Sequence, residues 1–207
     1  MIISVSRRTD IPAFYAEWFY NRLRAGYVLV RNPMNVHSVS KVALSPEVVD
    51  AFVFWTKNPL PLMKRLDELA EYPYYFQFTL TGYGKEIEPG LPDKKQVLLP
   101  AFKELAAKTG RQRVIWRYDP IFFSSRYSAE YHLQCFETLA AELSGSTERC
   151  VISFMDEYRN TKRNAQKLGA VSYSSEEIYA FAARLAKIAE KYGLKLEFRP
   201  FIKVEGV

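Results

Sequence analysis

Six runs of apolar and aromatic residues, each ending abruptly in a cluster of polar residues, constrain the fold of this chain most. The runs are Ile2–Val5, Val28–Val30, Phe52–Trp55, Tyr74–Phe78, Val114–Trp116 and Val151–Phe154. Buried parallel strands read as continuous apolar runs, and in α/β proteins the chemistry gathers where those strands end. The pattern therefore predicts an α/β fold and locates its site at the polar clusters.

Stretches with helical periodicity follow most of these runs. Helices are predicted over residues 12–25, 58–69, 97–108, 128–143 and from 174 onward, where Ser174 and Glu177 form a capping box. The run Val28–Val30 belongs to a predicted hairpin, and Leu194–Phe198, after Gly193, is predicted as the sixth core strand. The core strands recur about every 35 residues, the size of a right-handed βαβ unit.

Six such strands could form an open doubly wound sheet or a partial barrel. An open sheet usually concentrates its ligand at one switch point, whereas polar clusters at every strand end suggest a ring around one mouth. We therefore predict a TIM-barrel-like (β/α) barrel or partial barrel of about six parallel strands, in a single domain over residues 1–207. Two extended pieces around the turn at 32–35 predict a small inserted hairpin near residues 27–44.

Composition narrows the partners only slightly. The net charge of +6 and the pI near 9.2 permit anionic partners, but Lys and Arg are spread along the chain, so nucleic-acid binding is possible and not favoured. Cys135 and Cys150 lack a zinc-binding spacing and are expected to be buried thiols in a reducing cytoplasm. No leader and no apolar run of membrane-spanning length is seen, so we expect a cytoplasmic protein without a membrane partner.

The first polar cluster places Arg7, Arg8 and Asp10 directly after a buried strand. Guanidinium groups match the oxygens of carboxylates and phosphates, so these residues are predicted to bind substrate. The alternative is that Asp10 caps the following helix and pairs with an arginine.

Two further clusters add candidates. Lys57, between Thr56 and Asn58, could bind phosphate, act as a base or form a Schiff base, and we take it as a catalytic candidate. Thr56 and, after the second run, Asn32 join the predicted substrate-binding residues. The alternative reading makes Asn58 a helix cap and turns Lys57 toward solvent.

The fourth run carries Gln77, Thr79 and Thr81, which share a face if the strand continues to Thr81. If that face lines the interior of a barrel, the three side chains form a polar ladder leading to Tyr83 and orient the substrate. Threonines placed at exposed strand positions by β-propensity are the alternative.

The last two clusters are the most charged. Arg117 and Asp119 share a strand face. They could form a structural ion pair, or Arg117 could bind substrate while Asp119 acts in catalysis. Asp156 is a third catalytic candidate, for proton transfer. No metal site is predicted, because the chain has only two histidines, His37 and His132. The common nucleotide-binding and hydrolase motifs are absent as well.

The strings SRRTDIPAFY, VRNPMN, FWTKNP, YYFQFTLTGYG and VIWRYDPI together resemble the bacterial and archaeal family called domain of unknown function 1848, over roughly residues 1–198. Members of that family typically continue to a C-terminal cysteine cluster similar to the iron–sulfur site of radical SAM enzymes. The resemblance thus implies a barrel-type fold and a [4Fe–4S] cluster with S-adenosylmethionine. This sequence has no cysteine after Phe198, so no cluster ligand carries over.

These observations favour an enzyme, radical-SAM-like or a relative without the cluster, that holds a small anionic molecule at the strand ends. The alternatives are a nucleic-acid-binding module and a truncated, non-catalytic member of the family.

Overall fold

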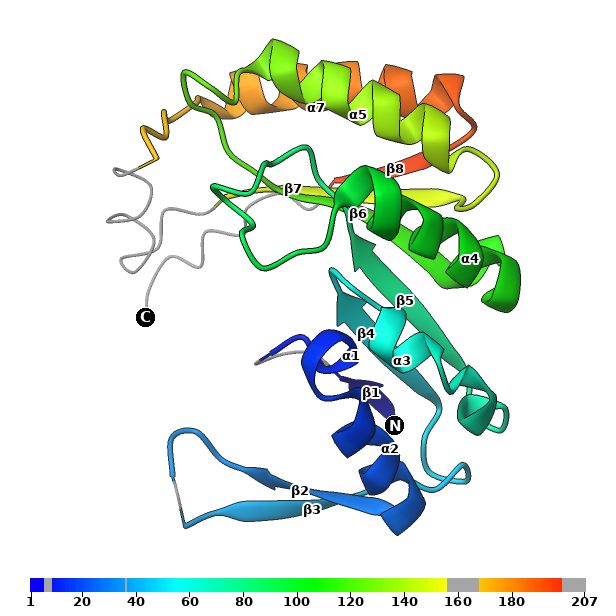
Figure 1. Ribbon diagram of the computed structural model, residues 1–207. Coiled ribbons are helices and arrows are strands. Elements are labelled where there is room, and N and C mark those ends of the chain that lie inside the picture. The colour runs from blue at the N-terminus through cyan, green and yellow to red at the C-terminus, as the bar shows by residue number, and fades with distance from the viewer. Residues whose placement is uncertain (6–8, 36, 156–167, 199–207) are drawn as a thin grey trace. The chain divides into compact units, whose positions relative to one another are not determined.

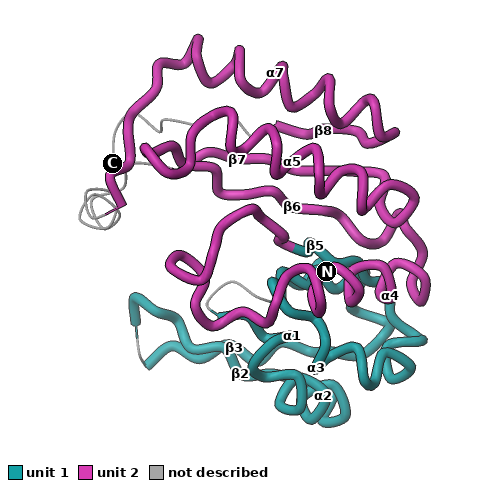
Figure 2. Tube along the Cα trace, turned by 45° about the horizontal axis from the view of Figure 1, so that its top comes forward, with its two compact units in different colours: residues 1–78 teal, residues 79–207 magenta. Residues whose placement is uncertain are grey.

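The computed structural model describes residues 1–5, 9–35, 37–155 and 168–198 (Figure 1). The chain divides into two compact units, residues 1–78 and residues 79–207, which Figure 2 shows in different colours. The single-domain organisation expected from the sequence stays a prediction.

Unit 1 contains three parallel strands in the order β1-β4-β5. They are β1 (Ile2–Ser4), β4 (Ala51–Thr56) and β5 (Tyr74–Thr79), whose last residue begins unit 2. Ile2 lies opposite Ala51, and Phe52 lies opposite Tyr74. Because neighbouring strands run in the same direction, their carboxyl ends meet at one edge of the sheet.

The first predicted helix is two helices, α1 (Ile11–Phe14) and α2 (Ala16–Ala25), separated by a non-helical Tyr15. Gly26 ends α2 in the left-handed conformation that favours glycine. Phe19 of α2 packs edge-on against the strand residues Phe52 and Phe54, with ring centroids 5.5 and 5.4 Å apart. The helices therefore cover the face of the sheet that carries the even-numbered residues of β4.

The predicted hairpin is confirmed as β2 (Tyr27–Arg31) paired antiparallel with β3 (Val39–Ala43). It forms a two-stranded sheet separate from the parallel strands. After β4, a short α3 (Leu60–Met63) and a 3₁₀ turn η1 (Leu66–Leu69) replace the single helix expected there.

Unit 2 contains the parallel strands β6, β7 and β8, in that order, with helices between them. Its described elements are η2 (Lys94–Leu98), α4 (Leu99–Thr109), η3 (Arg111–Arg113), β6 (Val114–Ile121), α5 (Ala129–Leu143), β7 (Arg149–Phe154), α7 (Ser175–Lys191) and β8 (Lys195–Phe198). The capping box of Ser174 and Glu177 is present at the start of α7, as predicted.

Helices α5 and α7 lie side by side on one face of these three strands (Figure 1). The ring of Phe136 in α5 packs against Trp116 and Tyr118 of β6, and Phe181 in α7 packs against Phe154 of β7. Residues that alternate with these point to the opposite face. Six parallel strands with intervening helices confirm the α/β class. In a barrel, helices cover the outer face of the strands, as α5 and α7 cover one face here. Closure of the strands into a ring stays a prediction.

Candidate functional site

Asp10 joins two strand ends in unit 1. Its Oδ1 accepts a hydrogen bond from the Ala13 N–H at 3.0 Å, which caps α1 as one of the sequence-based alternatives expected. Its Oδ2 accepts from the backbone N–H of Lys57 at 2.8 Å, directly after β4. The carboxylate thus links the residues that follow β1 to the residues that follow β4.

The environment of Asp10 raises the pKa of its carboxyl group. Loss of hydration on burial is the main cause, and the hydrogen bonds from Lys57, Thr56 and Ala13 oppose it. A carboxylate with a shifted pKa at the carboxyl ends of parallel strands is the kind of group that functional sites contain.

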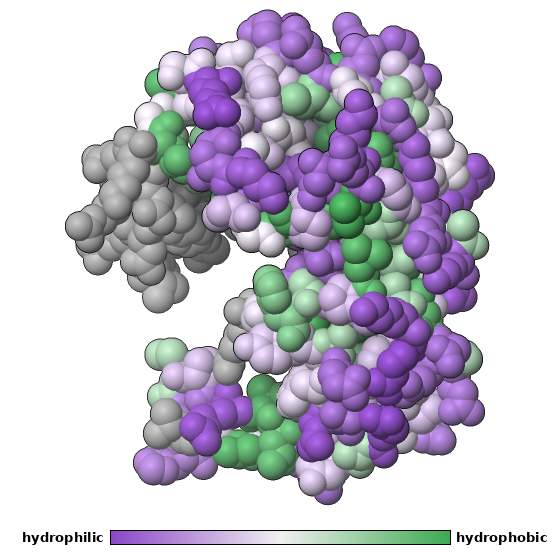
Figure 3. All heavy atoms as spheres, viewed as in Figure 1, coloured by the Kyte–Doolittle hydropathy of each residue, from purple (hydrophilic) through white to green (hydrophobic). Residues whose placement is uncertain are grey.

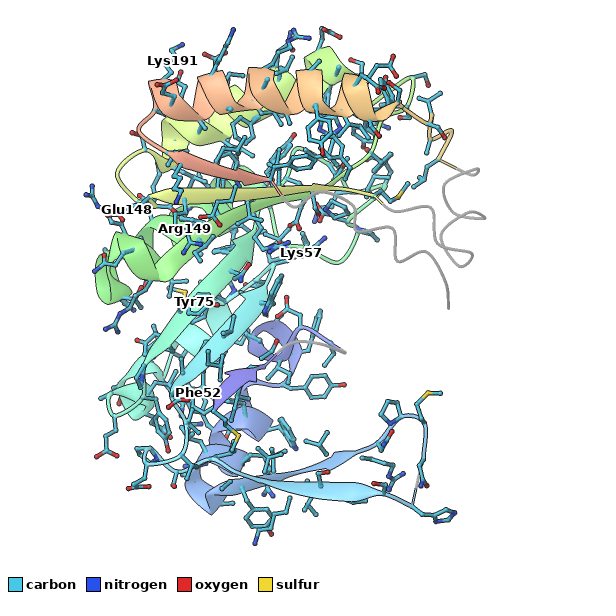
Figure 4. All side chains as sticks on the ribbon, turned by 180° about the vertical axis from the view of Figure 1, so that it is seen from behind. Phe52, Lys57, Tyr75, Glu148, Arg149 and Lys191 are labelled. Atoms are coloured by element: carbon cyan, nitrogen blue, oxygen red, sulfur yellow. The ribbon has the colours of Figure 1, made fainter. Side chains whose placement is uncertain are left out.

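The segment after β4 is held by its own side chains. The buried Thr56 hydroxyl accepts from the Asn58 N–H at 2.9 Å, and the Asn58 Oδ1 accepts from the Leu60 N–H at 3.3 Å, at the start of α3. Lys57 is half-buried between them, at the end of β4 (Figure 4). These bonds fix the backbone from which the Lys57 ammonium extends.

Arg7 and Arg8 lie outside the described residues, as does Asp156 in unit 2. Asn32 is exposed in the turn of the hairpin, where its Oδ1 accepts from the Met34 N–H at 2.9 Å. The structure therefore joins Asp10, Thr56 and Lys57, and it assigns Asn32 to a turn on the separate two-stranded sheet.

The predicted polar ladder is interrupted. Gln77 is buried on β5, and Thr79 is half-buried as its last residue. Thr81 lies beyond the strand, and its hydroxyl donates to the Glu88 carboxylate at 3.0 Å. The Lys94 ammonium forms an ion pair with Glu88 and also donates to the Thr81 carbonyl at 2.9 Å. Thr81 therefore helps to anchor the long loop that precedes η2.

Arg117 and Asp119 form a buried ion pair on β6. The Arg117 Nε donates to Asp119 Oδ1 at 2.9 Å, and Nη2 donates to Oδ2. The Ser153 hydroxyl, on neighbouring β7, donates to Asp119 Oδ2 at 3.1 Å. These three residues lie on the face that α5 and α7 leave uncovered. The arrangement supports a brace and a proton-transfer site equally.

His132, which no sequence motif marks as a site residue, connects several segments of unit 2. It is fully buried, with Nε2 2.9 Å from the Phe122 carbonyl and Nδ1 2.9 Å from the Tyr118 hydroxyl. Because a carbonyl only accepts, Nε2 carries the proton and Tyr118 donates to Nδ1. Burial lowers the pKa of His132. No local pattern could have revealed these contacts, since they join different elements.

The Tyr83 hydroxyl completes this cluster by donating to the Pro120 carbonyl at 2.8 Å and accepting from the Phe122 N–H at 3.0 Å. The ring of Tyr83 stacks on that of Phe122, with centroids 4.9 Å apart. Tyr83, at the end of the expected ladder, is thus buried and holds the start of the loop in place.

The described residues do not fit an iron–sulfur cluster. Cys150 is fully buried in β7, and Cys135 is half-buried on α5; both are free thiols. Nowhere in residues 1–5, 9–35, 37–155 or 168–198 do three or more Cys, His, Asp or Glu side chains gather in a way that could hold a metal ion. Iron–sulfur clusters are held mainly by four Cys thiolates, and the described residues do not bring such a set together.

None of the helices in the described part of the chain has the length and apolar character needed to cross a membrane.

Comparisons with known proteins identify the family of the chain. A search of curated proteins finds no match. The family model named Domain of unknown function (DUF1848) matches residues 2–198, which is nearly the whole chain. The protein therefore belongs to the DUF1848 family.

Proposed function

We propose that this protein is an enzyme that binds a small anionic molecule at the carboxyl ends of β1 and β4. The observation that carries the proposal is the hydrogen bond from the Lys57 backbone to Asp10. It brings the end of β4 to Asp10, the N-cap of α1, which lies two residues after Arg8 in the sequence. Ligands of α/β proteins bind at this edge of the strands.

Each residue of this cluster has a separate role in the proposal. The Lys57 ammonium contacts the anion, as a point charge with three donors. Asp10 is a positioning residue, because its carboxylate binds the backbone on both sides. Arg7 and Arg8, three and two residues before Asp10, supply further cationic groups for a phosphate or carboxylate.

Three expectations from the sequence are not part of this proposal: radical-SAM chemistry, proton transfer by Asp119 and a cytoplasmic location. Radical-SAM chemistry is not proposed, because the described residues do not supply cluster ligands. Asp119 in unit 2 stays a predicted proton-transfer group, with Ser153 as its hydrogen-bonding neighbour. The cytoplasmic location also stays a prediction.

Titration calorimetry with inorganic phosphate and with citrate tests the anion site. Lys57→Ala should weaken binding about tenfold or more, because a hydrogen bond to a charged group contributes about 1.5–3 kcal/mol. Lys57→Arg should retain part of the affinity. The matched control is Lys64→Ala, which removes an exposed lysine of the same unit and should leave the affinity unchanged.

Three results would overturn the proposal. They are no binding of either anion, unchanged binding by Lys57→Ala, or equal losses in the Lys57 and Lys64 variants. Salt-sensitive binding of a single-stranded oligonucleotide in place of the small anions would favour the nucleic-acid alternative.

A further inference from the structure

The β2–β3 hairpin exposes apolar side chains on both of its faces. Leu29 is 59% exposed and Val30 is 43% exposed, and as consecutive strand residues they point to opposite sides. Val39 on β3 is 50% exposed, and Met34 in the turn is 92% exposed. Figure 3 shows hydrophobic residues gathered over the middle of the hairpin.

Among the residues that the structure describes, the outer half of the hairpin lacks the packing that such an element needs. A two-stranded hairpin alone is at best marginally stable in water, and a third strand or a packed helix normally completes it. Residues Tyr27 and Val28, next to α2, are half-buried, whereas the later residues of β2 are exposed. A third strand would supply the missing contacts for the exposed half.

The backbone register leaves the outer edge of β3 ready for such a strand. Gly26 pairs with Leu44 and Asn32 with Ser38 through hydrogen bonds of 2.9 Å. The even-numbered residues therefore direct their N–H and C=O groups across the hairpin. Val39, Lys41 and Ala43 direct theirs outward, and within the described part of the chain no backbone hydrogen bond reaches them. An open edge of this kind is a template for pairing.

The charge of the hairpin defines what would pair there. Residues 27–46 include Arg31, His37 and Lys41 and no Asp or Glu. Two copies that paired β3 against β3 about Lys41 would place two lysines opposite each other, which destabilises a sheet. An extended segment that alternates acidic and apolar residues would place its acidic side chains beside Lys41 on one face of the hairpin and its apolar side chains beside Val42 on the other.

We propose that the outer edge of β3 binds an extended segment of a partner protein, with alternating acidic and apolar residues, as a third strand of the hairpin. Backbone hydrogen bonds would give affinity, and the side chains would give specificity. This surface is independent of the anion site at Lys57.

The test uses the whole chain and a fluorescein-labelled synthetic peptide of alternating valine and glutamate, followed by fluorescence anisotropy. Val39→Pro removes one outward N–H and adds a ring that edge strands tolerate. It should weaken binding tenfold or more, while the matched Val39→Ala, which keeps the N–H, should weaken it less. Lys41→Glu should also weaken binding. Circular dichroism and the thermal midpoint check that each variant folds.

Several outcomes would overturn the inference. Equal binding by wild type and Val39→Pro would do so, as would equal affinity for a valine–lysine peptide. Tight binding of an oligonucleotide that Lys41→Glu abolishes, with no peptide binding, would assign the edge to nucleic acid. A dimer in sedimentation that Val39→Pro dissociates would assign it to a second copy. Lys57→Ala should not change peptide binding, so failure of the anion site is distinguishable.

Discussion

Replacing Asp119 with alanine would leave the Arg117 guanidinium without its carboxylate in a site where both residues are less than a tenth exposed. The native pair has bidentate geometry and a third hydrogen bond from Ser153. Removing one partner of a buried ion pair costs about 3–5 kcal/mol, because the other charge stays buried without that counter-ion. We therefore expect the free energy of unfolding to fall by about that amount in Asp119→Ala.

Unit 2 contains a matched control for burial. Arg149 and Glu197 also form a bidentate pair, with Nε–Oε1 at 2.8 Å and Nη2–Oε2 at 2.9 Å, but their side chains are 44% and 31% exposed. Figure 4 labels Arg149 on β7. Because water solvates such a pair, its coupling energy should be about 1 kcal/mol or less.

Double-mutant cycles followed by urea unfolding measure both couplings. One cycle combines Arg117→Met with Asp119→Ala, and the other combines Arg149→Met with Glu197→Ala. The double variant of the buried pair should be more stable than Asp119→Ala alone, since no charge is left buried. Equal coupling energies in the two cycles, or a cost of less than about 1 kcal/mol for Asp119→Ala, would refute the expected effect of burial.

Two further predictions concern the cluster around His132 and the loop that it holds. Burial lowers the pKa of His132, so below about pH 6.5 the unfolded state takes up a proton that the folded state resists. The free energy of unfolding should therefore be highest above that pH and fall as the pH decreases. Urea unfolding between pH 5 and 8, roughly the range where histidine titrates, measures this dependence. His132→Gln should flatten the dependence of stability on pH, and His37→Gln, at an exposed position, should not. A Cβ at Gly82 would lie 2.8 Å from the Cβ of Cys135, so Gly82→Ala should cost about 1–3 kcal/mol. Gly90→Ala, with nothing within 4 Å, should be neutral in the same thermal unfolding assay, and a neutral Gly82→Ala would contradict the close packing.

The strands were predictable because they are nearly all apolar. Strand β7 (Arg149–Phe154) contains the expected run Val151–Phe154, and each of the other core strands overlaps its expected run. Helix continuity was less predictable. Tyr15 and Arg65 interrupt segments whose apolar spacing fits one helix, because packing on the strands outweighs local periodicity.

The candidate site was predictable only in part. The cap formed by Asp10 follows from local spacing, since its partner is three residues away. Its bond to Lys57 spans 47 residues, and nothing in either local sequence indicates it. Thr81 fits a strand pattern, yet its partners Glu88 and Lys94 come from the loop and the next helical turn.

The sequence by itself determined the class of the fold, the strand positions and the edge where polar residues gather, because burial and periodicity are written in consecutive residues. Tertiary structure alone decided which polar residues meet. It paired Asp10 with the Lys57 backbone, Asp119 with Ser153, and His132 with Tyr118. The reason is physical: a buried polar group must find a partner, and most of these partners come from other elements.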